Sequence, residues 1–169
     1  MIDRLGNVKV VDFGRAVMAG EKVSFLLGSP LYMAPEIHRR EIGGIQSDFY
    51  SLGLVALEML RGEKIASGDD VNESDLLITK MNLLDSLSEI LPPHVLANEA
   101  LVSILGRFVE PDPVKRYSSA QEAEVGDEGL RVIDRQLVQA GLASEYGRDL
   151  AEYLSKLVDE KTQRIELVF

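Results

Sequence analysis

The segment from residue 12 to residue 36 constrains the fold of this chain more than any other stretch. It opens with Asp-Phe-Gly at residues 12–14, directly after the apolar, strand-like residues 8–11. It closes with Ala-Pro-Glu at residues 34–36, and the sequence Gly-Ser-Pro-Leu-Tyr at residues 28–32 leads into that end. Either tripeptide alone would indicate only turn residues, since Asp, Gly and Pro favour turns. Both tripeptides in this order, with the third motif between them, form a specific pattern.

This order of motifs is that of a protein-kinase activation segment, and the chain resembles the C-terminal lobe of a serine/threonine protein kinase. The resemblance implies that Asp12 is a ligand of Mg²⁺, that Phe13 packs to set active or inactive states, and that Gly14 lets the backbone turn. A carboxylate at a strand end suits Mg²⁺, which binds one or two carboxylates together with phosphate oxygens and waters. These three residues are therefore expected to contribute to binding of ATP and Mg²⁺ in a complete kinase.

The resemblance also assigns a role to the loop at residues 28–32. It places Ser29 where serine/threonine kinases carry a hydroxyl at the floor of the acceptor pocket, so Gly28, Ser29 and Tyr32 are expected to form an acceptor-site loop for a protein substrate. This sequence favours the serine/threonine class over tyrosine kinases. Ser24 lies near the position of the activating phosphate in many kinases and is a candidate phosphorylation site. The alternative is that Ser24 is an ordinary loop serine.

A long apolar stretch at residues 47–60 predicts a buried helix. Ser47 is suited to cap its N-terminus, and the residues that follow are apolar almost all round. The sequence from Asp48 to Gly53 matches D-x-[WY]-S-x-G on the central helix of the kinase C-terminal lobe. The resemblance implies that Asp48 accepts hydrogen bonds from the catalytic loop. Alternatively, Asp48 only helps to cap its own helix.

The stretch at residues 112–118 matches a further kinase signature, D-P-x-x-R-x-[ST]. The resemblance implies that Arg116 pairs with Glu36, which lies 80 residues earlier. A bidentate pair between an arginine and a carboxylate is suited to hold a loop against a helix. The predicted contact is a buried or half-buried ion pair.

The expected fold is mainly α, a protein-kinase-like C-lobe with a short N-terminal β-hairpin. Turn chemistry at residues 5–7 predicts that hairpin within residues 1–11, and helical spacing predicts helices at 75–90 and 99–109. Residues 1–123 correspond to a partial C-lobe with its activation segment at 12–36. Residues 124–169 form a helical extension whose two apolar stripes, around Leu137 and Leu154, favour packing in a core over a partner groove.

Composition excludes several classes of function. The net charge of −10 argues against a nucleic-acid partner, which requires a basic patch. The absence of cysteine excludes disulfides, thiolate metal sites and a cysteine nucleophile. No apolar run approaches the roughly 20 residues of a membrane helix, and the N-terminus has no signal-peptide pattern. No membrane partner and a cytoplasmic location are expected.

The 169 residues contain no H-R-D catalytic loop, no G-x-G-x-x-G loop and no V-A-I-K strand. The catalytic base is therefore expected upstream of Met1. The expected function is that of a partial serine/threonine kinase, inactive alone, which transfers the ATP γ-phosphate to protein when an N-lobe and catalytic loop complete it. The alternative is a non-catalytic, pseudokinase-like interaction or scaffold module, although Asp12 argues against it, since a scaffold needs no metal ligand. An exposed cleft is expected to bind a complementing N-lobe or a second copy.

Overall fold

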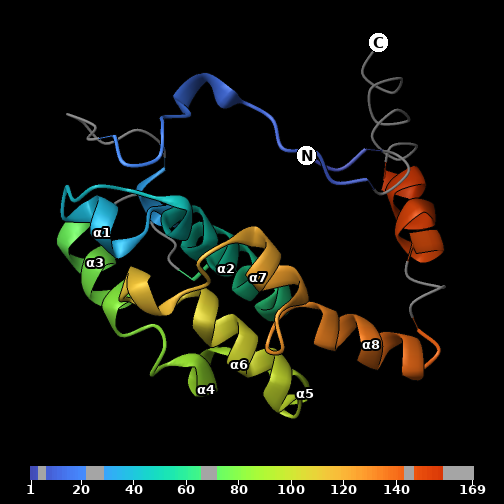
Figure 1. Ribbon diagram of the computed structural model, residues 1–169. Helices are drawn as coiled ribbons and strands as arrows, with labels where there is room; N and C mark the ends of the chain where they lie inside the picture. The colour runs from blue at the N-terminus through green and yellow to red at the C-terminus, as the bar shows by residue number, and fades with distance from the viewer. Residues whose placement is uncertain (4–6, 22–28, 66–71, 143–146, 158–169) are drawn as a thin grey trace. The chain divides into compact units, whose positions relative to one another are not determined.

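A computed structural model describes residues 1–3, 7–21, 29–65, 72–142 and 147–157. Within these ranges the chain is mainly helical (Figure 1), as the sequence predicts for a kinase-like C-lobe. Residues 147–157 are also helical. The other elements are α1 (Pro35–His38), α2 (Ile45–Arg61), α3 (Glu73–Met81), α4 (Leu87–Ile90), α5 (Pro93–Leu96), α6 (Glu99–Phe108), α7 (Ala120–Val125) and α8 (Arg131–Gln139), with 3₁₀ turns η1 (Phe13–Arg15), η2 (Pro30–Tyr32) and η3 (Pro113–Lys115).

The chain divides into two compact units, which are described one at a time. The larger unit comprises Arg15–Ile133, and the smaller comprises Met1–Gly14 together with Asp134–Phe169. The larger unit contains α1 to α7 and carries most of the buried apolar side chains.

Helix α2 is the longest described helix of the larger unit, and its ends have clear causes. It begins at Ile45, two residues before the predicted start. The N-cap residue is therefore Gly44 and not the predicted Ser47. Ser47 lies in the first turn, where its hydroxyl accepts a hydrogen bond from the Gly44 N–H at 3.3 Å. At the other end, Gly62 adopts a left-handed backbone with φ of 81°, which glycine tolerates without a Cβ clash.

The main core forms where α2 packs against α6. Tyr50, Leu54 and Leu57 of α2 are buried with Leu105 and Val109, which lie in and directly after α6. Gly53 permits this approach, because a Cβ there would lie 2.8 Å from both Phe108 Cβ and Val109 Cγ1. The glycine of the D-x-Y-S-x-G motif is therefore a packing requirement of the helix pair.

The opposite face of α2 is exposed, which corrects the expectation of a helix buried on all sides. Leu52, Val55 and Met59 are exposed by 53%, 42% and 72%. The described elements cover only the side of α2 that carries Tyr50 and Leu57. One face of α2 therefore lies in the core of the larger unit, and the opposite face is an exposed apolar surface.

A second cluster extends the core toward the end of the larger unit. The Phe108 ring contacts the Phe49 ring edge to face at a centroid distance of 6.1 Å and the tilted Tyr117 ring at 5.0 Å. The Arg107 guanidinium lies 4.2 Å from the Tyr117 ring centroid and contacts Glu122 of α7. These contacts join α6 to α7.

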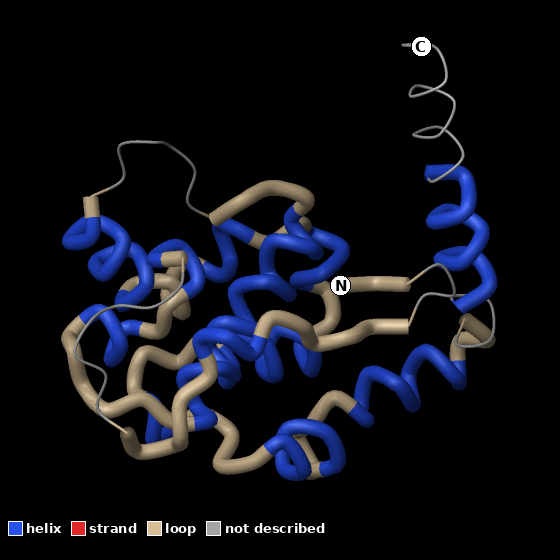
Figure 2. The backbone as a smooth tube through the Cα atoms, turned by 90° about the horizontal axis from the view of Figure 1, so that it is seen from above, coloured by secondary structure: helices blue, strands red, loops and turns tan. Residues whose placement is uncertain are grey.

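The predicted N-terminal β-hairpin is reduced to one antiparallel bridge between Ile2 and Val8, and no strand appears in the described part of the chain (Figure 2). The Lys9 N–H donates to the Met1 carbonyl at 2.8 Å, so the pairing exists but is short. Val8 and Val10 are exposed, and a two-stranded pairing without an apolar face to bury is marginal in water. Residues 5 and 6 of the predicted turn lie outside the described ranges.

Among the described residues, the C-terminal helices meet the expectation of core packing only at the start of α8, where Val132 and Ile133 are partly buried against the cluster of Phe108 and Tyr117. No residue of α8 is buried, and the apolar side chains of Leu137 and Val138 are exposed, as is Tyr153 in the later helix. The predicted break between the two stripes is present. Gly141 adopts φ of 73°, and the Leu142 N–H donates to the Leu137 carbonyl at 2.9 Å, which is the geometry of a glycine-terminated helix. None of the described helices has the combined length and apolarity needed to span a bilayer.

Candidate functional site

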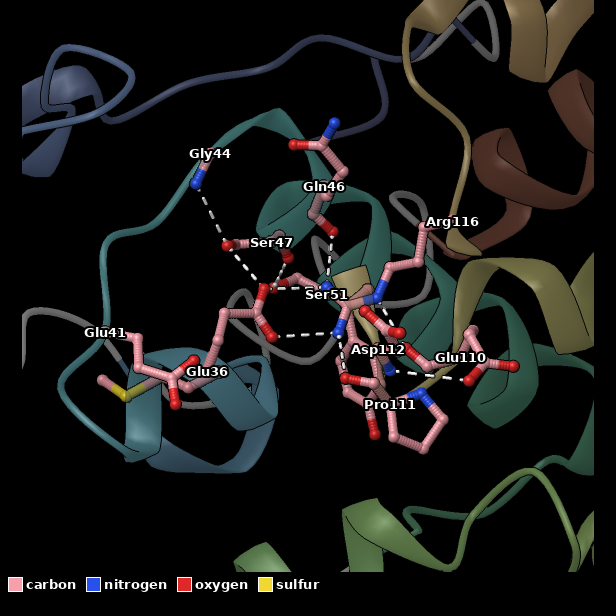
Figure 3. Close-up of polar contacts among 12 residues, drawn as sticks. Glu36, Glu41, Gly44, Gln46, Ser47, Ser51, Glu110, Pro111, Asp112 and Arg116 are labelled. Atoms are coloured by element: carbon pink, nitrogen blue, oxygen red, sulfur yellow. Dashed lines mark hydrogen bonds and ion pairs between the residues drawn. The ribbon is translucent and has the colours of Figure 1, made fainter. Parts of the chain in front are cut away.

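A buried ion pair joins Glu36 and Arg116, as the sequence analysis expects. Glu36 lies in the first turn of α1, and Arg116 directly follows η3. The two guanidinium nitrogens contact the two carboxylate oxygens at 2.8 Å and 2.9 Å (Figure 3). The side chains are 3% and 0% exposed, so the pair is fully enclosed.

The remaining N–H groups of Arg116 bind backbone carbonyls. Nε donates to the Glu110 carbonyl at 2.6 Å, and the two terminal nitrogens donate to the carbonyls of Gln46 and Pro111 at 2.9 Å and 3.0 Å. All five N–H donors of the guanidinium are therefore used. The guanidinium carbon, Cζ, also lies 4.7 Å from the Tyr50 ring centroid, within the range of a cation–π contact. Arg116 thus contacts three segments: α1, the start of α2, and the loop before η3.

Glu36 is held in its ionised form. The Ser47 hydroxyl donates to Glu36 Oε1 at 2.7 Å, beside the contact from Arg116. Burial raises the pKa of this carboxyl, but the hydrogen bonds from Arg116 and Ser47 outweigh burial and hold the pKa below its ordinary value. The pair therefore stays charged at neutral pH.

The loop that leads into α1 is bound to α2 through Tyr32. The Tyr32 hydroxyl donates to Glu58 Oε2 at 2.8 Å, and the Ser51 hydroxyl donates to the Tyr32 carbonyl at 2.7 Å. The hydrogen bond to Glu58 raises the pKa of Tyr32, so the phenol remains protonated. Glu58 also accepts the Ile65 N–H at 3.1 Å, which fixes the orientation of its carboxylate.

A buried lysine of α3 binds the same loop from another side. Lys80 Nζ lies 2.6 Å from the Pro30 carbonyl, 2.7 Å from the Met33 carbonyl and 2.9 Å from Nε2 of His38. These contacts and those of Tyr32 hold residues 29–34, which we call the acceptor loop after the role that the kinase resemblance leads us to expect. The segment contains η2 and has polar anchors from α1, α2 and α3.

The Asp-Phe-Gly motif ends the N-terminal segment of the smaller unit and is exposed. Asp12 adopts a left-handed backbone with φ of 67°, whereas Gly14 does not. The positive φ that glycine tolerates best therefore occurs at Asp12, and the turn expected at Gly14 is made earlier in the motif, before Phe13. The Phe13 side chain is 70% exposed and packs in no core. The Asp12 side chain carries carboxylate oxygens, the type of ligand that Mg²⁺ prefers. No group of three or more metal-binding side chains was found among the described residues, so they fit Mg²⁺ only as a partial site.

The sequence of the chain was compared with those of known protein families. Residues 1–125 match the family model described as the protein kinase domain. The chain belongs to the protein kinase family.

The relatives of this kinase chain include serine/threonine kinases. It is 29% identical over 162 residues to the putative ribosomal protein S6 kinase alpha-1 of Caenorhabditis elegans, covering 94% of this chain and 18% of the relative. It is 28% identical over 161 residues to serine/threonine-protein kinase 17A of Oryctolagus cuniculus, covering 89% and 39%. The protein kinase C of Drosophila melanogaster is 33% identical over 119 residues, covering 69% and 15%. The chain therefore spans less than half of the length of these curated relatives.

The structure describes two of the other residues to which the kinase resemblance gives a role, Ser29 and Asp48. Ser29 is exposed directly before η2, and its carbonyl accepts the Tyr32 N–H at 3.1 Å. Asp48 is exposed in the first turn of α2, where a carboxylate is favoured by the helix dipole. Gly28 and Ser24 lie outside the described residues.

The contacts of Glu58, Lys80 and His38 were not predicted, although the spacing of Glu58 and Lys80 in the sequence indicates an internal partner. Glu58 lies seven residues after Ser51, so both polar side chains lie on one face of an otherwise apolar helix. Lys80 lies four residues after Leu76, and these are the buried residues of α3. A charged residue in register with a buried apolar one is a sign of an internal partner.

Proposed function

We propose that this chain is the C-lobe part of a serine/threonine protein kinase that transfers the γ-phosphate of ATP to a protein hydroxyl when an N-lobe and a catalytic loop complete it. The observation that supports this most is the bidentate pair between Glu36 and Arg116. That pair holds the end of the acceptor loop against α2. Phosphoryl transfer depends mostly on positioning and electrostatic stabilisation, so a rigid acceptor loop is a functional requirement of this chemistry.

Residues of this chain take two roles in the proposed reaction. The acceptor loop, with Ser29 exposed and Tyr32 anchored to Glu58, supports the backbone of the substrate peptide. Asp12 serves as one ligand of Mg²⁺, and Mg²⁺ with ATP, when bound, supplies the phosphoryl group and neutralises its charge. The proton of the substrate hydroxyl requires a base from the catalytic loop, which these 169 residues do not contain.

The exposed apolar face of α2 favours a second candidate, a kinase-derived interaction module without catalysis. Leu52, Val55 and Met59 present apolar side chains to solvent on one side of the helix. Exposed apolar patches often mark surfaces that bind other proteins. A scaffold of this kind would use the face of α2 and would not need Asp12.

The test is a complementation assay. Residues 1–169 are co-expressed with the N-terminal part of a related kinase, ending after its catalytic loop, and the purified complex is incubated with radiolabelled ATP, Mg²⁺ and a serine/threonine peptide library. We expect phosphate transfer by the wild-type complex and none by the matched Asp12→Ala complex. A complex that forms stably but transfers no phosphate would favour the scaffold. The in-frame DNA upstream of Met1 gives an independent check, because an encoded H-R-D motif and β3 lysine support the kinase.

A further inference from the structure

Lys80 is an unusual residue to find inside a small helical unit. It is 3% exposed, although lysine is almost never fully buried unless its charge is paired. Leu76, one turn earlier, shows that this face of α3 packs well with an apolar side chain. Packing alone therefore does not explain a lysine at this position, and its polar contacts must.

The three N–H donors of the Lys80 ammonium group match three acceptors. Two are the carbonyls of Pro30 and Met33, which lie on either side of Leu31 and Tyr32 in the acceptor loop. The acceptor loop contains Pro30 and is followed by Pro35, and neither proline has an N–H to donate, so the loop has few backbone hydrogen bonds of its own. The Lys80 ammonium group donates to two carbonyls of the loop, in place of the backbone N–H donors that the prolines lack.

The third acceptor is the imidazole of His38, whose side chain is also buried. A lysine ammonium can only donate, so His38 serves as the third acceptor when its Nε2 carries no proton. Nε2 also lies 3.1 Å from the Pro30 carbonyl, which Lys80 binds as well. Nδ1 lies 3.5 Å from Glu73 Oε1 without the alignment of a hydrogen bond. Burial, and then the charge of Lys80, lower the pKa of His38, which agrees with a neutral ring.

We propose that Lys80 is a positioning residue for the substrate: with neutral His38 it fixes the backbone of the acceptor loop in the shape that receives the acceptor peptide. This inference rests on the proposed function, because it takes the loop to be the peptide site. Lys80 touches neither ATP nor the reacting hydroxyl in this account. It acts through the carbonyls of Pro30 and Met33.

The inference carries a pH dependence with two limits. Protonation of His38 would put a second positive charge and an N–H opposite the Lys80 ammonium, so the contact is lost in acid. Burial lowers the pKa of Lys80 to about 8, so at alkaline pH the amine has only two protons for three acceptors. The other titratable groups that face this pair are Glu73 beside His38 and Tyr50, whose hydroxyl donates to the Lys80 carbonyl at 3.0 Å.

The first test uses NMR on residues 1–169 alone, with ¹³C-labelled carbonyls at Pro30 and Met33. We expect both carbonyl signals to shift in Lys80→Met, which keeps a side chain of similar length without the charge. We expect Lys80→Arg to restore them in part, since it keeps a cationic donor. In the wild type both signals should titrate together near pH 8. Unchanged signals in a folded Lys80→Met variant would overturn the inference and leave the proposed function untouched.

The second test measures steady-state kinetics in the complemented kinase. We expect Lys80→Met to raise KM for the acceptor peptide about tenfold, as for loss of one or two charge-assisted hydrogen bonds, with KM for ATP unchanged. Lys80→Arg should recover part of the loss. An equal change in both KM values, or none in either, would contradict a role specific to the peptide. If the complemented wild type has no activity, the proposed function fails, and the NMR result alone decides whether Lys80 positions the loop.

Discussion

Arg116 shows how one side chain can hold distant segments together. Its guanidinium binds Glu36 twice and three backbone carbonyls once each, with no solvent exposure. A buried ion pair adds little net stability compared with a well-packed apolar pair, because desolvating both charges is costly. Removing one partner is different, since the other charge then stays buried without compensation.

Arg116→Ala should therefore lower the free energy of unfolding by about 3–5 kcal/mol. The variant removes the two contacts of Arg116 with the Glu36 carboxylate and its hydrogen bonds to three carbonyls, and leaves Glu36 with the hydrogen bond from the Ser47 hydroxyl. The neighbouring Lys115→Ala is the control, because that side chain is largely exposed and the change should stay within about 0.5 kcal/mol. Urea denaturation followed by circular dichroism measures both. An equal effect of the two variants would contradict a structural role for the pair.

His38 should make the stability of the larger unit depend on pH. Its pKa in the folded chain lies below the ordinary value of 6.5, so the unfolded chain takes up more protons in that window. The contribution is complete above about pH 6.5 and is lost as the pH falls through the folded pKa, with a slope of at most about 1.4 kcal/mol per pH unit. Urea denaturation between about pH 5 and pH 8 should show this slope in the wild type and not in His38→Gln. The same slope in both would assign it to other groups.

The pair formed by α2 and α6 depends on a close approach of backbones rather than on the number of apolar residues. Helix α2 has apolar side chains on both faces, yet only the face with Gly53, Leu54 and Leu57 is buried. Gly53 lets the side chains of Phe108 and Val109 come near the backbone of α2. The position of one glycine thus selects which face of α2 forms the core.

Gly53→Ala should lower the free energy of unfolding by about 1–3 kcal/mol, because overpacking at this contact outweighs the gain in helix propensity of about 1 kcal/mol. Gly147→Ala is the matched control. Gly147 is also helical, but nothing lies within 4 Å of where its Cβ would be, so the control should be neutral or slightly stabilising. Thermal and urea denaturation report both changes. Stabilisation by Gly53→Ala would show that α2 and α6 can separate at little cost.

Taken as a whole, residues 1–169 belong to the protein kinase family, and in the proposed function they contribute the acceptor loop but not the motifs that bind most of the nucleotide. Asp12 is exposed and is a single carboxylate, and one carboxylate without phosphates is a poor octahedral site for Mg²⁺. The H-R-D loop and the V-A-I-K lysine motif of the family do not occur in residues 1–169. Positioning and electrostatics account for nearly all catalysis in this chemistry, so partial positioning gives little rate.

Residues 1–169 purified alone should therefore transfer no phosphate from ATP to protein or peptide. A radiolabelled transfer assay over an ATP and Mg²⁺ titration should give the same background for the wild type and for Asp12→Ala. Isothermal titration calorimetry should show weak ATP binding in both. Activity in the wild type that disappears in Asp12→Ala would mean that fewer parts are indispensable than the family chemistry requires.

The sequence by itself predicted the family, the mainly helical fold, the position of α2 to within two residues, and the contact between Glu36 and Arg116. Short motifs and helical periodicity predict these features, and both are properties of residues that are neighbours in the sequence. The burial of Lys80 and His38 and the contact between Glu58 and Tyr32 were not predicted, nor was the exposed face of α2. Whether a lysine is buried, or an apolar face covered, depends on which distant segments meet it. Only the tertiary structure decides that, since burial and hydrogen bonding are properties of the packed chain and not of local sequence.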